Sequence, residues 1–269
     1  MGILNVTPDS PSDGGRLFSS DADVFDHAVG ILESGADILD IGGESTGPGA
    51  SAVSEQDELK RVMPAIERLA AERPKAILSV DTVKSRVARA ALDAGAHVVN
   101  DVSGLRFDPG IASVCAKVGA GLIVMHSRGG SVSELSSYQH ASYGQVVPEV
   151  LAELRKRVEL ARHGGVGDEH IAVDPGVGFA KRPEHSLAVL GALPELVQWG
   201  YPVVAAVSRK RFIGEITGVR EPAARLAGTL GATVTALALG ARIFRVHDVR
   251  AAREALDVAW EVLKHRNPA

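Results

Sequence analysis

The sequence of 269 residues is poor in aromatic residues and in long apolar runs. Phe, Trp and Tyr make up only 4% of it, so Ala, Val and Leu must fill most of a core, as in many α/β proteins. No run reaches the roughly 18 apolar residues of a membrane span, and polar Asn5 and Thr7 interrupt the N-terminus too early for a signal peptide. We therefore expect a cytoplasmic protein without a membrane partner.

Cysteine and excess positive charge are also scarce. The one cysteine, Cys115, lies in an apolar helical segment with no second thiol to pair with, which predicts a reduced core residue and not a nucleophile. The formal net charge of -4 provides no basic field for nucleic acid or an anionic membrane. A bound anion must then be met by a few placed cations, and we expect a small-molecule partner.

What the sequence has is one unit repeated eight times: a short apolar segment, a polar or Gly-rich turn, and an amphipathic segment of helical spacing. The expected strands cover residues 2–6, 37–41, 76–81, 97–101, 121–126, 170–174, 202–208 and 243–247. One expected helix, 54–72, begins with the capping pair Ser54 and Asp57, and another covers 145–163. Apolar strands alternating with helices indicate a parallel sheet covered on both faces. Eight such units close a TIM barrel, so we predict a single (β/α)8 barrel domain over residues 1–269.

The alternative architecture is two doubly wound domains. A Pro-, Gly- or Ser-rich linker would then divide the chain, but the spacing of strand and helix stays regular through the middle of the sequence. The single barrel is therefore favoured. Because the chain begins almost on its first strand, we expect the N-terminal mouth of this barrel to be less well covered.

Polar residues follow the expected strands, where the active sites of such barrels lie. A lone Asp at such a position is usually a helix cap, and a lone His is usually a core residue. Recurrence at all eight strand ends outweighs that interpretation and predicts a polar rim. The residues concerned are Asn5, Asp81, Asn100, Asp101, His126, Asp174, Ser208, Arg209, Lys210, Arg245, His247 and Asp248, together with the segment GGESTGPGA after the second strand.

The rim predicts a ligand with two different parts. Asp81, Asn100 and Asp174 suit a flat heterocycle rich in N–H donors, since a carboxylate accepts two parallel hydrogen bonds. Lys210, Arg245 and His247 suit oxygens such as those of a phosphate, which the last strands of these barrels commonly bind. The Gly-, Ser- and Pro-rich segments 7–15 and 44–50 have the composition of loops that close over a site.

With these residues assembled, the chain resembles the dihydropteroate synthase family along nearly its whole length. The motifs are MGILNVTPDS with SDGG, DILDIGGEST with PGA, SVDT, VNDVSG, VMH, DPGVGFAK, SRKRFIG and RVHDV, in the family's order and spacing. The resemblance implies a (β/α)8 barrel that joins 7,8-dihydropterin-6-ylmethyl pyrophosphate to p-aminobenzoate. The products would be 7,8-dihydropteroate and pyrophosphate, and family members are commonly homodimers.

The resemblance also implies roles for single residues. The pterin pocket would comprise Asp81, Asn100, Asp174 and Lys210, with Met125 and Phe179 as further substrate contacts. The pyrophosphate would be held by Asn5, Arg245 and His247, with Mg²⁺ bridging its oxygens to Asn5 and with Asp13 as a further metal ligand. The catalytic set would be Lys210, Asp81, Asp174, Arg245 and His247. Thr46 and the two loops would close over p-aminobenzoate.

Three positions depart from the usual family pattern near the p-aminobenzoate site, which is also the site of sulfonamide drugs. Pro11 stands where the family usually has Phe, and Gly47, before Pro48, stands where it usually has Arg. Arg211 replaces a common Ser but matches other members. The first two substitutions suggest either a sulfonamide-tolerant enzyme or neutral drift in an exposed loop.

Two other functions fit parts of the pattern. A pterin-binding methyltransferase domain that presents a methylated folate to a corrinoid would keep the acidic pocket, but would have less need of Lys210, Arg245 and His247. A pterin-binding module without activity would have little reason to keep Asn5 and Asp13. The retained residues favour the synthase, whose assay is pyrophosphate release that depends on p-aminobenzoate.

Overall fold

The computed structural model describes residues 1–7, 20–47 and 51–266, and its core is a ring of parallel strands. Six strands pair in chain order: β1 (Gly2–Asn5), β2 (Ile38–Gly42), β3 (Ile77–Asp81), β4 (Val98–Asp101), β5 (Gly121–Met125) and β6 (Ile171–Asp174). β7 (Val204–Ala205) and β8 (Ile243–Phe244) form a two-stranded sheet. Single bridges complete the ring, Val173 to Val203 on one side and Gly2 to Val246 on the other.

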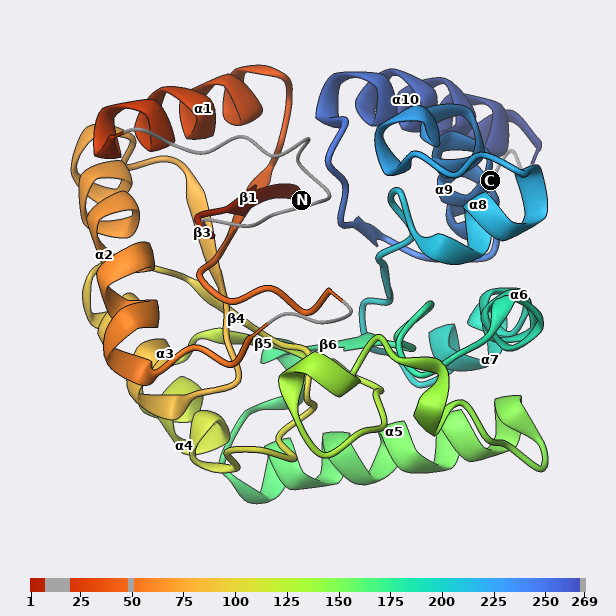
Figure 1. Ribbon diagram of the computed structural model, residues 1–269, viewed down its shortest axis with the longest axis horizontal. Coiled ribbons are helices and arrows are strands. Elements are labelled where there is room, and N and C mark those ends of the chain that lie inside the picture. The colour runs from red at the N-terminus through yellow and green to blue at the C-terminus, as the bar shows by residue number, and fades with distance from the viewer. Residues whose placement is uncertain (8–19, 48–50, 267–269) are drawn as a thin grey trace.

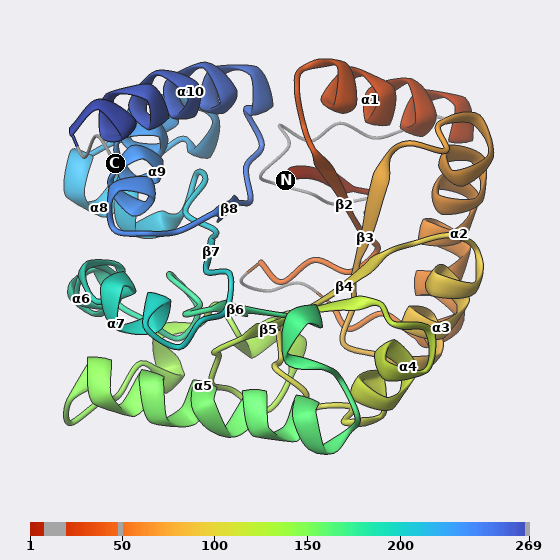
Figure 2. The same cartoon turned by 180° about the vertical axis from the view of Figure 1, so that it is seen from behind.

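Helices surround the strands in chain order, so that β1 to β6 lie inside a ring that runs from α1 to α10 (Figure 1). Figure 2 shows the same ring from behind. The helices are α1 (Asp21–Glu33), α2 (Glu55–Glu72), α3 (Ser85–Asp93), α4 (Gly110–Val118), α5 (Val146–His163), α6 (Pro183–Gly191), α7 (Leu193–Val197), α8 (Arg211–Thr217), α9 (Leu226–Ala238) and α10 (Val249–Arg266). This arrangement confirms the predicted (β/α)8 class.

The local sequence explains these elements. At the start of α2 the Ser54 hydroxyl accepts a hydrogen bond from the Asp57 backbone N–H, which confirms the predicted capping pair. Val62, Ile66 and Leu69 of this helix are fully buried against the sheet. Cys115 is buried in α4, and burial raises the pKa of its thiol to about 12, so the thiolate form that a nucleophile needs is suppressed.

The last two strands are shorter than the predicted segments 202–208 and 243–247. Val203 and Val246 lie outside the two strands and each forms an isolated bridge, to Val173 and to Gly2. Arg209 has a positive φ of 58°, where extended backbone is impossible. At the other end of the barrel a cavity is lined by Met1, Ile38, Ile243 and Trp260 among others.

Register places polar side chains in layers inside the barrel. Asn5 pairs with Gly42, Gly42 with Asp81 and Asp81 with Asn100, so all four stand at one level. Asp40 pairs with Ser79 two residues below, on the same face because strand side chains alternate. The strand ends therefore bring residues distant in sequence into one inward-facing cluster.

Two glycines with similar backbone conformations offer a test of this packing. Gly104 (φ 61°) follows β4, and a Cβ there would lie 2.4 Å from the Met125 carbonyl oxygen; Gly119 (φ 67°) ends α4 with open space around it. We expect Gly119→Ala to cost about 1 kcal/mol of unfolding free energy, and Gly104→Ala about 2 kcal/mol more, because its backbone must also shift. Urea denaturation of both variants measures this difference. Equal losses would contradict the close approach of the two loops.

Candidate active site

A cavity of about 350 Å³ opens at the carboxyl ends of the strands, a size within the usual range for small-molecule sites. Every predicted site residue that the structure describes lines it: Asn5, Thr46, Gly47, Asp81, Asn100, Met125, Asp174, Phe179, Lys210, Arg211, Arg245 and His247. Pro11, Asp13 and Pro48 lie outside the described residues. The predicted set is therefore brought together, while the role of each residue stays a prediction.

An ion cluster forms the floor of the cavity. Arg245 donates from Nε to Asp40 at 2.6 Å and from Nη2 to Asp81 at 2.8 Å. Burial by itself lowers the pKa of Arg245, but the two carboxylates outweigh it and hold that pKa above its ordinary value. Burial raises the pKa of Asp81 to about 8; Arg245 opposes this rise and Asp40 adds to it. The guanidinium is thus a permanent cation whose plane is set by two carboxylates.

Asp40 is the central residue of this cluster, and the sequence interpretation did not single it out. Its side chain is fully buried and also accepts hydrogen bonds from Ser79 Oγ at 2.6 Å and from Asn100 Nδ2 at 3.0 Å. A signal was present, since a carboxylate inside the apolar strand DILDIGG must find partners within the fold. Asp40 orients both Asn100 and Arg245 from below.

Asp174 and Lys210 face each other on the far side of the cavity. Burial raises the pKa of Asp174, while Lys210 opposes this shift. Burial lowers the pKa of Lys210 to about 8, and Asp174 counters part of that shift. Lys210 donates to the Val177 carbonyl oxygen and its Nζ lies 4.4 Å from the centre of the Phe179 ring. The carboxyl group of Asp174, the amine of Lys210 and the ring of Phe179 therefore line the same part of the cavity.

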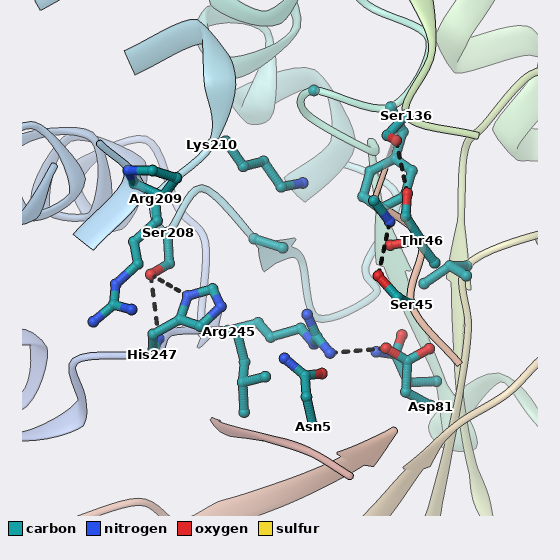
Figure 3. A pocket seen from close by; sticks show the side chains of 18 of the residues that line it. Asn5, Ser45, Thr46, Asp81, Ser136, Ser208, Arg209, Lys210, Arg245 and His247 are labelled. Carbon is teal, nitrogen blue, oxygen red and sulfur yellow. Dashed lines mark hydrogen bonds and ion pairs between the residues drawn. The ribbon is translucent and has the colours of Figure 1, made fainter. Parts of the chain in front are cut away.

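His247 and Ser208 form the next part of the wall, beside Lys210 and opposite Asp81 (Figure 3). Ser208 Oγ lies 2.9 Å from His247 Nδ1 and accepts the His247 backbone N–H at 3.2 Å. These two contacts set the plane of the imidazole. In the same view the Lys210 side chain extends into the cavity, and Asn5 rises from β1 beneath Arg245.

Three of the predicted rim residues are not among the cavity's lining residues, which corrects the expectation that all point to one rim. Asp101 is buried and accepts the backbone N–H groups of Ser103 and Leu105. Asp248 pairs with Arg209 at 2.7 Å, and His126 is almost fully buried beneath the site. Each is used by local backbone or by an ion pair, so a polar strand end does not by itself predict a ligand contact.

The described part of the second loop is tied to the barrel. The Thr46 carbonyl oxygen accepts a hydrogen bond from Ser136 Oγ at 2.7 Å. Glu44 accepts the Val53 backbone N–H at 2.9 Å and pairs with Lys84 at 2.6 Å. Lys84 also pairs with buried Glu58 of α2. The root of this loop is thus fixed by a lysine shared between two carboxylates.

Arg211 differs from its neighbour Lys210. Its guanidinium carbon lies 3.2 Å from the centre of the Tyr138 ring, and its Nε lies 3.2 Å from Glu215. Its side chain is 44% exposed, whereas Lys210 reaches inward. Arg211 therefore stacks at the rim of the cavity and does not contact its floor.

The oxygens around Asn5 suit a hard cation. Asn5 lines the cavity, and the nearby Thr7 hydroxyl is buried without a hydrogen-bond partner among residues the structure describes. Those residues contain no cluster of three His, Cys, Asp or Glu side chains placed to hold a metal. Mg²⁺ commonly binds through one or two protein oxygens together with substrate phosphates and waters, so the donors present fit that ion.

Asp40 and Asp37 provide a matched test of the ion cluster. Asp40→Ala leaves Arg245 without its buried partner and is expected to cost about 3–5 kcal/mol of unfolding free energy. Asp37, which precedes the same strand and forms an exposed pair with Arg253, should cost less than about 1 kcal/mol when changed to Ala. Chemical denaturation measures both. Similar losses would show that Asp40 is not the centre of the cluster.

The geometry of the site agrees with similarity to known proteins. Residues 1–247 match the family model described as pterin binding enzyme. The dihydropteroate synthase of Synechocystis sp. is 45% identical over 259 residues, which cover 96% of this chain and 88% of that protein. No helix among the described residues is long and apolar enough to cross a membrane.

Solved structures agree with this similarity. Xanthomonas albilineans dihydropteroate synthase with 4-aminobenzoic acid is 43% identical, with a TM-score of 0.87, and covers 98% of this chain and 92% of its own. Yersinia pestis dihydropteroate synthase in a sulfonamide drug complex is 37% identical, with a TM-score of 0.90 and coverage of 98% and 93%. The chain therefore belongs to the pterin binding enzyme family, in its dihydropteroate synthase branch, and is a transferase that forms a C–N bond.

Proposed function

We propose that this enzyme condenses 7,8-dihydropterin-6-ylmethyl pyrophosphate with p-aminobenzoate, giving 7,8-dihydropteroate and pyrophosphate. The observation that supports it best is the chemical composition of the cavity lining. Asp81, Asn100 and Asp174 supply carboxylate and amide groups for a heterocycle, while Arg245 and His247 supply cationic or N–H groups for a leaving anion. The bound 4-aminobenzoic acid of the Xanthomonas albilineans relative supports the second substrate.

In the proposed reaction the bond between the pterin methylene carbon and the pyrophosphate oxygen breaks first. The bonding electrons leave with pyrophosphate, beside Arg245 and His247, and the pterin methylene becomes a cation. Asp81 and Asp174 favour that positive charge from the pterin side. The aniline nitrogen of p-aminobenzoate then forms the C–N bond with its lone pair and loses a proton. This order resembles an SN1 reaction.

Mg²⁺ would supply charge neutralisation for the departing pyrophosphate. Asn5, with the oxygen of Thr7 nearby, would hold it, and Asp13 is the further ligand that the family resemblance predicts. Thr46 and the neighbouring loops would exclude water, which would otherwise consume the cation. A homodimer and a cytoplasmic location stay predictions.

The alternatives require fewer of these groups. A domain that presents a methylated pterin to a corrinoid needs the heterocycle pocket but no anion site, and a module that only binds needs no charge for a leaving group. Two carboxylates hold Arg245 toward the cavity. Burying these charges costs desolvation free energy, which favours a function for Arg245 in the site. The deciding assay is release of pyrophosphate from the pterin substrate with and without p-aminobenzoate. Failure to form 7,8-dihydropteroate when both substrates are present would exclude the synthase.

Lys210 and Arg211 are adjacent, but only Lys210 reaches into the cavity. Because a charged hydrogen bond contributes about 1.5–3 kcal/mol, we expect Lys210→Ala to lower kcat/KM at least about tenfold more than Arg211→Ala. Steady-state kinetics with both substrates varied checks this. Losses of equal size would mean that the rim position of Arg211 is as important as the inward position of Lys210.

Metal removal should separate binding from turnover. The groups expected to hold the pterin ring are not the oxygens expected to hold Mg²⁺, so excess EDTA should abolish turnover and leave pterin binding within about threefold. Calorimetry with a pterin in EDTA measures the binding, and restored activity on adding Mg²⁺ is the control. Loss of pterin binding in EDTA would contradict the division of the cavity.

We also propose that the enzyme discriminates against sulfonamides relative to p-aminobenzoate. Drug and substrate share the aniline half, so tolerance needs a difference between the two affinities and not a weaker site alone. The sulfonamide substituent would extend beyond the carboxylate position toward the loops that carry Pro11 and Gly47. Pro11 removes the usual aromatic ring and fixes its own φ, and Gly47 removes a cation.

The test restores the family residues with Pro11→Phe and Gly47→Arg in one variant. Among the described residues, a Cβ at position 47 would meet Ser45 Oγ at 3.3 Å, so the Ser45 side chain must shift slightly to admit the new residue. We expect the ratio of the inhibition constant for sulfamethoxazole to KM for p-aminobenzoate to fall at least about threefold. Arg211→Ala serves as a rim control. An unchanged ratio in the double variant would leave neutral drift as the account of both positions.

A further inference from the structure

Beneath the cavity lies a lysine that the reaction does not use. Lys181 is the last residue of the motif DPGVGFAK, and its side chain is fully buried. Its Nζ lies 2.8 Å from His126 Nδ1, 3.1 Å from the Gly176 carbonyl oxygen and 3.1 Å from the Phe179 carbonyl oxygen. A buried lysine with three such partners has a specific structural task.

The hydrogen-bond pattern determines which atoms donate. Burial lowers the pKa of His126 to about 3, and the nearby charge of Lys181 adds to this effect, so the imidazole is neutral. Its Nε2 lies 3.1 Å from Glu153 Oε2. Burial raises the pKa of Glu153, but hydrogen bonds from His126 and Arg128 outweigh it and lower that pKa. A carboxylate requires a donor, so Nε2 carries the hydrogen and Nδ1 accepts from Lys181.

All three partners of Lys181 are therefore acceptors. Burial lowers the pKa of Lys181 well below its ordinary value, and nearby Asp174 opposes that shift. The geometry favours the charged form, because a neutral amine has two N–H groups whereas an ammonium has the three that these acceptors require. Glu153 lies on α5, His126 follows β5, and the two carbonyl groups belong to the loop after β6. The network thus connects a helix on the outside of the barrel to a loop at the cavity.

That loop needs such support because its own backbone is unusual. Gly176, Gly178 and Ala180 all have positive φ, at 68°, 80° and 45°, and the value at Ala180 is strained for a residue with a Cβ. A Cβ at Gly176 would lie 1.8 Å from the His126 carbonyl oxygen. Side chains hold much of the loop in place by donating hydrogen bonds to its carbonyl oxygens. Lys181 donates to two of them, Lys210 donates to that of Val177 and the Tyr143 hydroxyl donates to that of Ala180.

We propose that Lys181 is a positioning residue for the substrate contact at Phe179: its ammonium, oriented by His126 and Glu153, holds the 175–180 loop so that the Phe179 ring stands on the cavity wall. This rests on the proposed function, since Phe179 is predicted to contact substrate. Lys210 donates to the Val177 carbonyl oxygen of this loop and is also predicted to contact the ligand, so its hold on the loop can change when a ligand binds. Lys181 then keeps the loop in shape while Lys210 moves.

The first experiment compares Lys181→Met, which keeps the length of the side chain but removes its donors, with Lys156→Met on the exposed face of α5. With KM measured for each substrate in turn, we expect Lys181→Met to raise KM for the substrate that contacts Phe179 at least about tenfold, because misplacement by an ångström is costly. Amide exchange of residues 175–181, measured without substrates, should become faster. Lys156→Met should change neither.

A second pair tests the acceptor at position 126 and still decides the question if Lys181→Met fails to fold. Asn and Leu have similar shapes, but only the Asn side-chain oxygen can accept from Lys181 in place of Nδ1. We expect KM for the same substrate to rise at least about fivefold more in His126→Leu than in His126→Asn. Equal values in the two variants would overturn the proposal.

Other outcomes are equally decisive. In one outcome, Lys181→Met lowers the melting temperature but changes neither KM nor amide exchange at residues 175–181. That result would show that the lysine only stabilises the fold. Wild-type protein that fails to form 7,8-dihydropteroate when both substrates are present would refute the proposed function and not this inference. In that case the exchange comparison alone decides whether Lys181 holds the loop.

Discussion

The site depends on one interaction, the buried contact between Asp40 and Arg245. It joins β2 to the chain just after β8, two segments 205 residues apart, on either side of β1. Among the described residues the ring is closed there by one bridge, Gly2 to Val246, with backbone hydrogen bonds from Ile3 to Val246, from Val246 to Met1 and from Met1 to Phe244. A charge pair inside the barrel is costly to desolvate, and it is satisfied here because Asp40 accepts from Arg245, Ser79 and Asn100 together.

This cluster gives the cavity its two chemical sides. Arg245 is drawn toward β2 and β3, so a cation stands among carboxylates at the floor, while Lys210 reaches in from the opposite side beside Asp174. Each charged group is turned toward a partner before any ligand arrives. Preorganised charge of this kind stabilises charge that develops in a reaction without a further cost of reorientation. The proposed loss of pyrophosphate requires such an arrangement.

Below the rim, the structure uses buried polar groups in a second way. Lys181, His126 and Glu153 form a path of hydrogen bonds from α5 to the loop that carries Phe179. The loop itself has three residues with positive φ and cannot be held by strand pairing. Networks of this kind are costly when incomplete, but specify one geometry when every member is satisfied.

The repeat of apolar strand and amphipathic helix was sufficient to predict the barrel. The pattern of apolar and polar residues within each unit shows which of its faces is buried, without knowledge of the other units. The same repeat put Asn5, Asp81, Asn100, Asp174 and Lys210 at strand ends, and the structure brings them around one cavity. Asp101 and Asp248 also follow strands, but Asp101 accepts backbone N–H groups and Asp248 pairs with Arg209. Their partners are set by turn geometry and packing, which a strand pattern does not contain.

The sequence by itself determined the fold class, the strand ends at which polar residues gather, and, through its motifs, the family. Tertiary structure alone decided which polar groups share a hydrogen bond. Asp40 became the centre of the site only when β2, β3, β4 and β8 met inside the barrel, and Lys181 found His126 only through the packing of two loops. The reason is physical: burial is favoured residue by residue, whereas a buried charge is stabilised by partners that lie tens to hundreds of residues away.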